Sequence, residues 1–133
     1  MSDDLKDLKE KTKKTADLYF KGMTGEGAFP LWRTFDKDLA KDLSMFFTGK
    51  LYAREKIPHR TRQLVAVAAL TVLERKDELR AHIWAALNVG CSSKEIAEVI
   101  FQMITYGGVP IANQALSVLR DVLKERGELP EKE

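Results

Sequence analysis

A glutamate and a histidine four residues apart are the first groups in the sequence with catalytic potential. On a helix, this spacing places the side chains of Glu78 and His82 on one face. The carboxylate could then orient the imidazole and raise its pKa. Arg60 and Arg62 lie upstream, and a guanidinium can hold a carboxylate through two hydrogen bonds. The four residues predict proton transfer on an anionic substrate, with His82 as the acid or base.

The same residues admit two other interpretations. A glutamate and a histidine at this spacing often form a solvated surface pair, which adds roughly 0.2–0.5 kcal/mol to helix stability. A metal site would need more ligands, because the spacing of Glu74, Glu78 and His82 is not that of a zinc or di-iron site. We therefore expect no bound metal ion.

A helix-turn-helix is the alternative for residues 86–99. The small, glycine and apolar positions of that motif are matched by Ala86, Gly90, Ile96 and Val99. The helix that would read DNA carries Lys94 as its one cation, with Glu95 and Glu98 beside it. Two acidic groups oppose contact with phosphates. We expect two helices packed at a sharp turn and no nucleic-acid partner.

Apolar residues recur at intervals of three and four in the first half of the chain, which is the period of a helix face. The pattern predicts an N-terminal helix over about residues 3–23, followed by a break at three glycines and Pro30. A second helix is predicted over about residues 31–47, ending at Thr48-Gly49. Its expected inner face consists of Phe35, Leu39, Leu43 and Phe46.

The second half of the chain continues the helical pattern. Pro58 suits the start of a helix, and the helix that follows is apolar on nearly every face, so we expect it to be buried on most sides. A helix over residues 78–88 carries Glu78 and His82 and ends before Gly90. Ser92 and Glu95 fit a capping box for the next helix. The last helix starts at Pro110, and the sequence as a whole predicts an all-α fold of about six helices.

Length and composition limit the remaining function classes. The 133 residues predict a single domain over 1–133. The formal net charge is +2 with interleaved signs, which gives no electrostatic argument for binding nucleic acid or an anionic membrane. The longest apolar run, residues 64–73, is far shorter than the roughly 20 residues of a membrane span. The N-terminus has no apolar leader segment, so we expect a cytoplasmic location and no membrane partner.

Apolar residues are more abundant than six short helices can cover within one chain, and this excess predicts a homo-oligomer. The single cysteine, Cys91, allows neither an internal disulfide nor a paired redox site.

Several segments between about residues 60 and 113 resemble the carboxymuconolactone decarboxylase family. The matching segments are Arg62-Gln63-Leu64, Glu78-Leu79-x-x-His82-x-x-x-Ala86-Leu87-Asn88-x-Gly90, Glu95-Ile96-x-Glu98-Val99 and Tyr106-Gly107-Gly108-x-Pro110-x-Ala112-Asn113. The resemblance implies a helical fold shared with the alkylhydroperoxidase AhpD group, a family core over about residues 58–126, and assembly into trimers or hexamers.

Two chemistries occur in this family. The AhpD-like branch uses a CxxC pair followed by a histidine, but the positions of those cysteines hold Arg75 and Glu78 here. Cys91 lies beyond the helix, in the turn after Gly90, and does not match a redox position. The resemblance therefore excludes thiol chemistry of the AhpD type for this chain.

The other branch performs cofactor-free decarboxylation of 4-carboxymuconolactone in the breakdown of aromatic compounds. The resemblance implies that His82 is the general acid/base, which delivers a proton as carbon dioxide leaves and the double bond shifts. Glu78 would orient and charge the imidazole, and Arg62 or Arg60 would bind a substrate carboxylate. Tyr106 would either supply a hydroxyl or pack. No cofactor is expected.

One residue departs from the family pattern. Gln63 stands where both branches commonly carry glutamate, and an amide cannot take up or give a proton at physiological pH. A proton relay through this position is therefore broken or runs through Glu78, or else the substrate differs. Two alternatives follow: a family member without peroxidase thiols that acts on another small molecule, or a non-catalytic oligomeric binding or scaffold protein.

Overall fold

The computed structural model describes residues 2–131, so the first and the last two residues of the predicted 1–133 domain lie outside it. The described residues form helices joined by turns, which confirms the all-α prediction. The helices are α1 (Asp3–Phe20), α2 (Ala28–Phe35), α3 (Lys37–Ser44), the π-helix η1 (Met45–Tyr52), α4 (His59–Val72), α5 (Lys76–Asn88), α6 (Ser93–Gln102), the one-turn α7 (Ile104–Gly107) and α8 (Val109–Arg126). Among the described residues, no helix has the length and apolar character that crossing a membrane requires.

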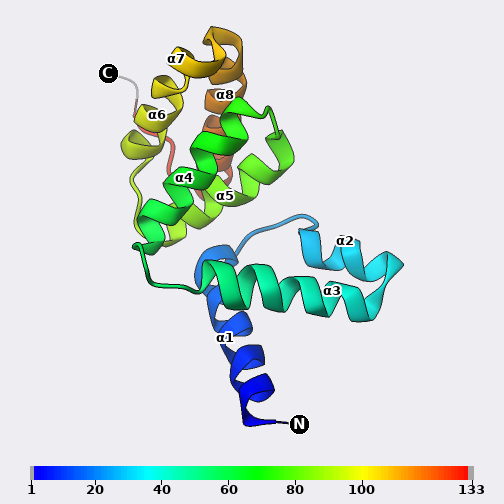
Figure 1. The fold of residues 1–133 in the computed structure, drawn as a ribbon. Coiled ribbons are helices and arrows are strands. Elements are labelled where there is room, and N and C mark those ends of the chain that lie inside the picture. Colours follow the sequence, from blue (N-terminus) through cyan, green and yellow to red (C-terminus); the bar gives the residue numbers. More distant parts are fainter. Residues whose placement is uncertain (1, 132–133) are drawn as a thin grey trace.

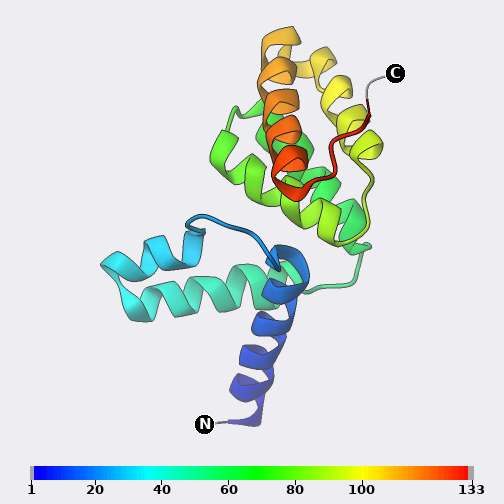
Figure 2. The same ribbon diagram turned by 180° about the vertical axis from the view of Figure 1, so that it is seen from behind.

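The helices form two parts, a bundle and an arm (Figures 1 and 2). The bundle consists of α4–α8, and the apolar core lies between these helices. The arm consists of α1, α2, α3 and η1, which pack on one another, and α1 also packs on α5. In both views α2 and α3 extend to the side, away from the bundle.

Local signals in the sequence explain the turns of the bundle. Gly90 has a φ of +97°, and the N–H of Cys91 donates to the carbonyl of Ala86 at 2.9 Å, which closes the last turn of α5. The capping box of Ser92 and Glu95 then starts α6, as predicted. These two features fix the sharp turn between α5 and α6.

The second predicted helix is wrong in extent and in orientation. Asp36 is extended, and its carboxylate accepts from the N–H of Leu39 at 2.8 Å, so it caps α3 and separates it from α2. The expected inner residues Phe35, Leu39 and Phe46 are exposed, Phe35 to 84%. Helical periodicity identified an apolar face but could not show that the chain leaves that face uncovered.

The predicted helix stop at Thr48-Gly49 is also wrong, because both residues lie inside η1. Gly49 is buried where η1 crosses α1, and a methyl group there would collide with the hydroxyl of Thr12. This glycine therefore permits close helix packing and does not end a helix.

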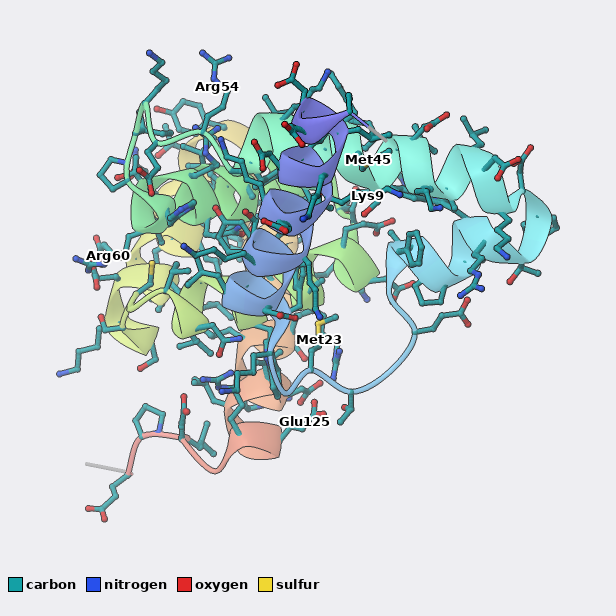
Figure 3. The ribbon with its side chains drawn as sticks, turned by 90° about the horizontal axis from the view of Figure 1, so that it is seen from below. Lys9, Met23, Met45, Arg54, Arg60 and Glu125 are labelled. Atoms are coloured by element: carbon teal, nitrogen blue, oxygen red, sulfur yellow. The ribbon has the colours of Figure 1, made fainter. Side chains whose placement is uncertain are left out.

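Side chains of the bundle hold the end of α1 by its backbone. The indole Nε1–H of Trp84 donates to the Lys21 carbonyl at 3.0 Å. The Asn88 amide donates to the carbonyls of Tyr19 and Lys21 at 2.9 and 3.0 Å. The hydroxyl of Thr24, which follows α1, donates to the carboxylate of Glu125 in α8, and Figure 3 labels Glu125 and the neighbouring Met23 from below. The arm is thus fixed to α5 close to Tyr19.

An apolar face of α4 is uncovered in the single chain, contrary to the expectation that this helix is buried on most sides. Val65 and Leu73 are each 60% exposed, and Ala69 and Val72 between them are exposed too. The chain exposes 8858 Å², whereas a compact monomer of this mass exposes about 7,100 Å². The extended arm and the open face of α4 contribute to the difference.

Candidate functional site

His82 lies in the middle of α5 and is held by a side chain of α4. Its Nδ1 is 2.8 Å from Oε1 of Gln63, which is fully buried. The Tyr52 ring lies 5.7 Å from the imidazole, and the Phe20 ring from the arm lies 6.3 Å from it, in an edge arrangement. The site therefore draws on α4, α5 and the arm.

Burial controls the charge of His82. It lowers the pKa of His82 from 6.5 to about 4, while the carboxylate of Glu78 opposes this with a smaller effect. Glu78 thus acts in the expected direction but does not raise the pKa of His82 overall. It is exposed, and the orienting hydrogen bond comes from Gln63 instead. His82 is neutral near pH 7.

A neutral imidazole carries its proton on one nitrogen. Because Oε1 of Gln63 can only accept, Nδ1 of His82 carries the proton and donates it to Gln63. The other ring nitrogen, Nε2, then has a free lone pair. In this form His82 can accept a proton or a hydrogen bond from a ligand.

The two candidate arginines differ in their surroundings. Arg62 donates from Nη2 to the Arg54 carbonyl at 3.1 Å, and its buried Nε has no partner among the described residues. Its charge counteracts the rise that burial causes in the pKa of Tyr19 and of Tyr52, which connects it to the surroundings of His82. Arg62 thus acts on Tyr19 and Tyr52, and the Tyr52 ring is the one that lies 5.7 Å from the His82 ring.

Arg60 is engaged elsewhere. Its Nη2 lies 2.6 and 2.7 Å from the two carboxylate oxygens of Glu95, an exposed pair that joins the starts of α4 and α6. In Figure 3, Arg60 projects from the edge of the molecule. Tyr106 is 68% exposed on α7, a helix that packs on α6 and α8. The single chain does not bring either residue to His82.

Cys91 is buried in the turn between α5 and α6. Its thiol donates to the Arg60 carbonyl at 3.6 Å, and burial raises its pKa. A buried thiol with a raised pKa is a poor nucleophile.

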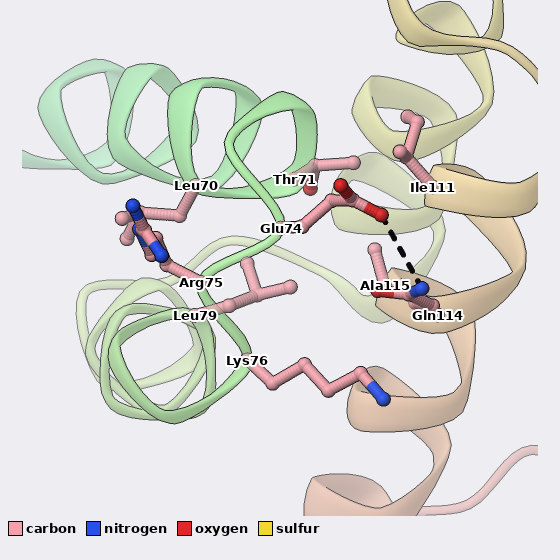
Figure 4. A pocket seen from close by; sticks show the side chains of 9 residues that line it. All are labelled: Leu70, Thr71, Glu74, Arg75, Lys76, Leu79, Ile111, Gln114 and Ala115. Carbon is pink, nitrogen blue, oxygen red and sulfur yellow. Dashed lines mark hydrogen bonds between the residues drawn. The ribbon is translucent and has the colours of Figure 1, made fainter.

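Two hollows in the described part of the chain can be compared by size. The crevice in Figure 4, between the α4–α5 turn and α8, has no room for a water molecule. A larger hollow of about 600 Å³ lies between α1 and residues 53–59, and His59 is part of its wall. Across residues 2–131, no three His, Cys, Asp or Glu side chains gather in a way that could hold a metal ion.

Comparison with known proteins identifies the family. The model of the carboxymuconolactone decarboxylase family matches residues 37–121, more than half of the chain. The chain belongs to this family. It is similar to a 4-carboxymuconolactone decarboxylase from Acinetobacter baylyi, with 38% identity over 98 residues, or 74% of this chain and 73% of the relative. It is also similar to an uncharacterized 15.0 kDa protein from the nqo9-nqo10 intergenic region of Paracoccus denitrificans, with 39% identity over 88 residues, or 65% of each chain.

The carboxymuconolactone decarboxylase match includes Tyr52, Gln63 and His82 but leaves α1 outside. Nevertheless, α1 brings two aromatic residues to the site. Phe20 contacts His82, and the Tyr19 hydroxyl contacts Nδ1 of His59 and lies 3.3 Å from the Tyr52 carbonyl.

Sequence reasoning missed these aromatic residues as parts of the site. It read Tyr19 and Phe20 only as members of the apolar face of a helix. Spacing along one helix cannot relate Tyr19 to Tyr52 and His59, which follow it by 33 and 40 positions. The available signal was a tyrosine on an apolar face, because a buried hydroxyl requires a hydrogen-bond partner.

Proposed function

We propose that the protein is a cofactor-independent decarboxylase that acts on 4-carboxymuconolactone or on a related small carboxylated lactone or keto acid. The observation that carries the proposal is the partly buried contact between His82 and Gln63, with Arg62 on the same helix as Gln63. The similarity to the decarboxylase of Acinetobacter baylyi supports the choice of reaction.

In the proposed reaction, the bond between the ring and the departing carboxylate breaks and carbon dioxide leaves. The electron pair remains on the substrate as the double bond shifts, and His82 delivers a proton to the carbon that gains the charge. Free His82 is neutral, so it must take up this proton from water after the substrate binds. A bound anion favours the imidazolium form, and the Glu78 carboxylate acts in the same direction.

Arg62 is the favoured ligand for a substrate carboxylate, because its Nε has no partner among the described residues. Arg60 is the second candidate, and it would first have to leave Glu95. Tyr106 would reach the site only from a neighbouring subunit, since α7 packs on α6 and α8 in its own chain.

The proposal includes a homo-oligomer, a trimer or a hexamer, in the cytoplasm, with a role in the breakdown of aromatic compounds. The exposed apolar face of α4 and the uncovered aromatic side chains of the arm support association of subunits. An oligomer would also enclose the surroundings of His82 further and exclude water from them.

The test is turnover of freshly generated 4-carboxymuconolactone, followed by ultraviolet absorbance. We expect turnover by the wild type, its loss in His82→Ala with an unchanged oligomer, and its retention in Gln102→Ala, a control at an exposed position. Absence of turnover by folded, oligomeric wild-type protein would reject this substrate.

Gln63 favours a second candidate function, because an amide cannot relay protons. In that case the protein binds a small anion without converting it. Calorimetric titration with the intact lactone would then show binding without heat of reaction, whereas a decarboxylase would show continuing heat from turnover.

A further inference from the structure

Tyr19 is a buried polar residue that the arm inserts beside the catalytic candidates. Its side chain is 1% exposed. The hydroxyl contacts Nδ1 of His59 and lies 3.3 Å from the Tyr52 carbonyl oxygen. A carbonyl only accepts hydrogen bonds. The single proton of Tyr19 is therefore used on the side of His59 and Tyr52, whichever of the two receives it.

Gln63 is the neighbour on the other side of Tyr19. Its Oε1 faces His82, while its Nε2 is buried and has no well-formed hydrogen bond to any described residue. A buried amide N–H without an acceptor is strongly unfavourable. The Tyr19 hydroxyl contacts His59, which lies one helical turn before Gln63 on the same face of α4, so the Tyr19 oxygen lies beside the amide. Hydrogen bonding from Gln63 also counteracts the rise that burial causes in the pKa of Tyr19. A small shift would let Nε2–H donate to this oxygen.

Counting donors and acceptors fixes the orientation of the amide. Because the Tyr19 proton points away, the Tyr19 oxygen can offer only a lone pair to Gln63. The amide must therefore turn its N–H toward Tyr19 and its oxygen toward His82. With the amide flipped, two acceptors would meet at Tyr19, and an amide N–H would donate to Nδ1 of His82 and move the histidine proton to Nε2.

We propose that Tyr19 is a positioning residue that acts through Gln63 to keep the proton of His82 on Nδ1 and to leave Nε2 free toward the substrate. This inference rests on the proposed role of His82, but the proton position can be measured without turnover. Tyr19 affects His82 by orienting the amide of Gln63, because an amide does not pass a proton from one residue to the other. A glutamate at position 63 would have no N–H for Tyr19, so glutamine fits this tyrosine where glutamate does not.

The experiment compares wild-type protein with Tyr19→Phe, which lacks only the hydroxyl. Nitrogen-15 NMR of labelled histidine distinguishes a protonated ring nitrogen from an unprotonated one. The chain has two histidines, and the signals that disappear in His82→Gln belong to His82. We expect the Nδ1–H form of His82 in the wild type and a measurable population of the Nε2–H form in Tyr19→Phe. We also expect a fall of about tenfold in kcat/KM, the lower end of the losses that follow when an outer partner of a metal-ligating histidine is removed.

Tyr52→Phe is the matched control for the tautomer. It removes the hydroxyl of a ring that lies 5.7 Å from the His82 ring, but the backbone carbonyl of Tyr52, which faces Tyr19, remains. We expect its His82 signals to match the wild type, and circular dichroism checks that both variants are folded. An Nε2–H form in the wild type would overturn the proposal even if Tyr19→Phe did not fold.

An unchanged tautomer in folded Tyr19→Phe would also overturn the positioning role. If His82→Ala still abolished turnover, the proposed function would stand without it. Conversely, a shifted tautomer in a protein that does not turn over the lactone would support the positioning role and reject only the substrate.

Discussion

The Oε1 atom of Gln63 accepts a hydrogen bond from Nδ1 of His82 at 2.8 Å. The resemblance to the family implies a carboxylate at this position. The difference between amide and carboxylate is one charge in a buried position. With a neutral partner, burial lowers the pKa of His82 to about 4. Gln63 therefore orients the histidine without favouring its doubly protonated, charged form.

Gln63→Glu should favour the charged form of His82. A carboxylate next to Nδ1 favours the imidazolium, so we expect the pKa of His82 to rise by roughly 1–3 units. NMR titration of the two histidines measures this directly. If His82 delivers the proton during decarboxylation, activity near pH 7 should rise as well. A raised pKa without any gain from a measurable baseline activity would argue against a relay through position 63.

Stability should depend on pH through His82. Its pKa is near 6.5 when unfolded and about 4 when folded. Between these values the unfolded chain binds more protons, so acid favours unfolding. The wild type should lose about 3 kcal/mol through His82 as the pH falls from 7 toward 4. Denaturant unfolding gives the free energy of unfolding of the wild type and of His82→Gln. The difference between the two should shrink as the pH falls. A constant difference would show that His82 is not buried in its neutral form.

The attachment of α1 should depend on Asn88. Asn88→Ala removes two donors to the carbonyls of Tyr19 and Lys21 and the acceptor of a 3.0 Å bond from Arg126. We expect a loss of about 2 kcal/mol in the free energy of unfolding, and lower activity because Tyr19 moves. Gln102→Ala, at an exposed helix end, is the control and should change stability little. Equal behaviour of the two variants would contradict the role of Asn88.

The sequence predicted the bundle better than the arm. In residues 58–126, glycines, capping residues and apolar periodicity all indicate the same helix boundaries, and the turn at Gly90, Ser92 and Glu95 formed as expected. In the arm, Asp36 serves as a helix cap inside an apolar pattern, and Gly49 serves as a packing contact inside a helix. The sequence alone does not distinguish an aspartate that caps a helix from one inside a helix, or a glycine that packs inside a helix from one that ends it.

The part of the candidate site that lies on a single helix could be predicted, and the part that depends on tertiary contacts was missed. Glu78 and His82 were found by spacing within one helix. The pairing of Gln63 with His82 and the approach of Tyr19 come from packing between α1, α4 and α5. The sign of the pKa shift of His82 was missed because burial, which outweighs Glu78, is a property of the folded chain.

Glu74 should be replaceable by glycine with a gain in stability. It follows the end of α4 with a φ of +59°, and the N–H of Arg75 donates to the Leu70 carbonyl at 3.0 Å, a turn that favours glycine. Relief of the left-handed strain should stabilise Glu74→Gly by about 1 kcal/mol in thermal unfolding. Gly90→Ala is the matched control: its methyl group would meet only the Arg60 side chain at ordinary distance, so the φ of +97° alone should destabilise it. No gain in Glu74→Gly would mean that the bond from Gln114 to Glu74 outweighs the strain.

The exposed face of α4 should carry the association of subunits. Val65→Glu places a charge on this face, and burying it against another subunit would be strongly unfavourable. Light scattering after gel filtration should show the wild type as an oligomer and Val65→Glu as a smaller species at the same concentration. Leu129→Glu makes the same change at an exposed apolar residue outside the helices and should keep the oligomer. An intact oligomer in Val65→Glu would exclude this face of α4 and direct attention to the exposed side chains of α2, α3 and η1.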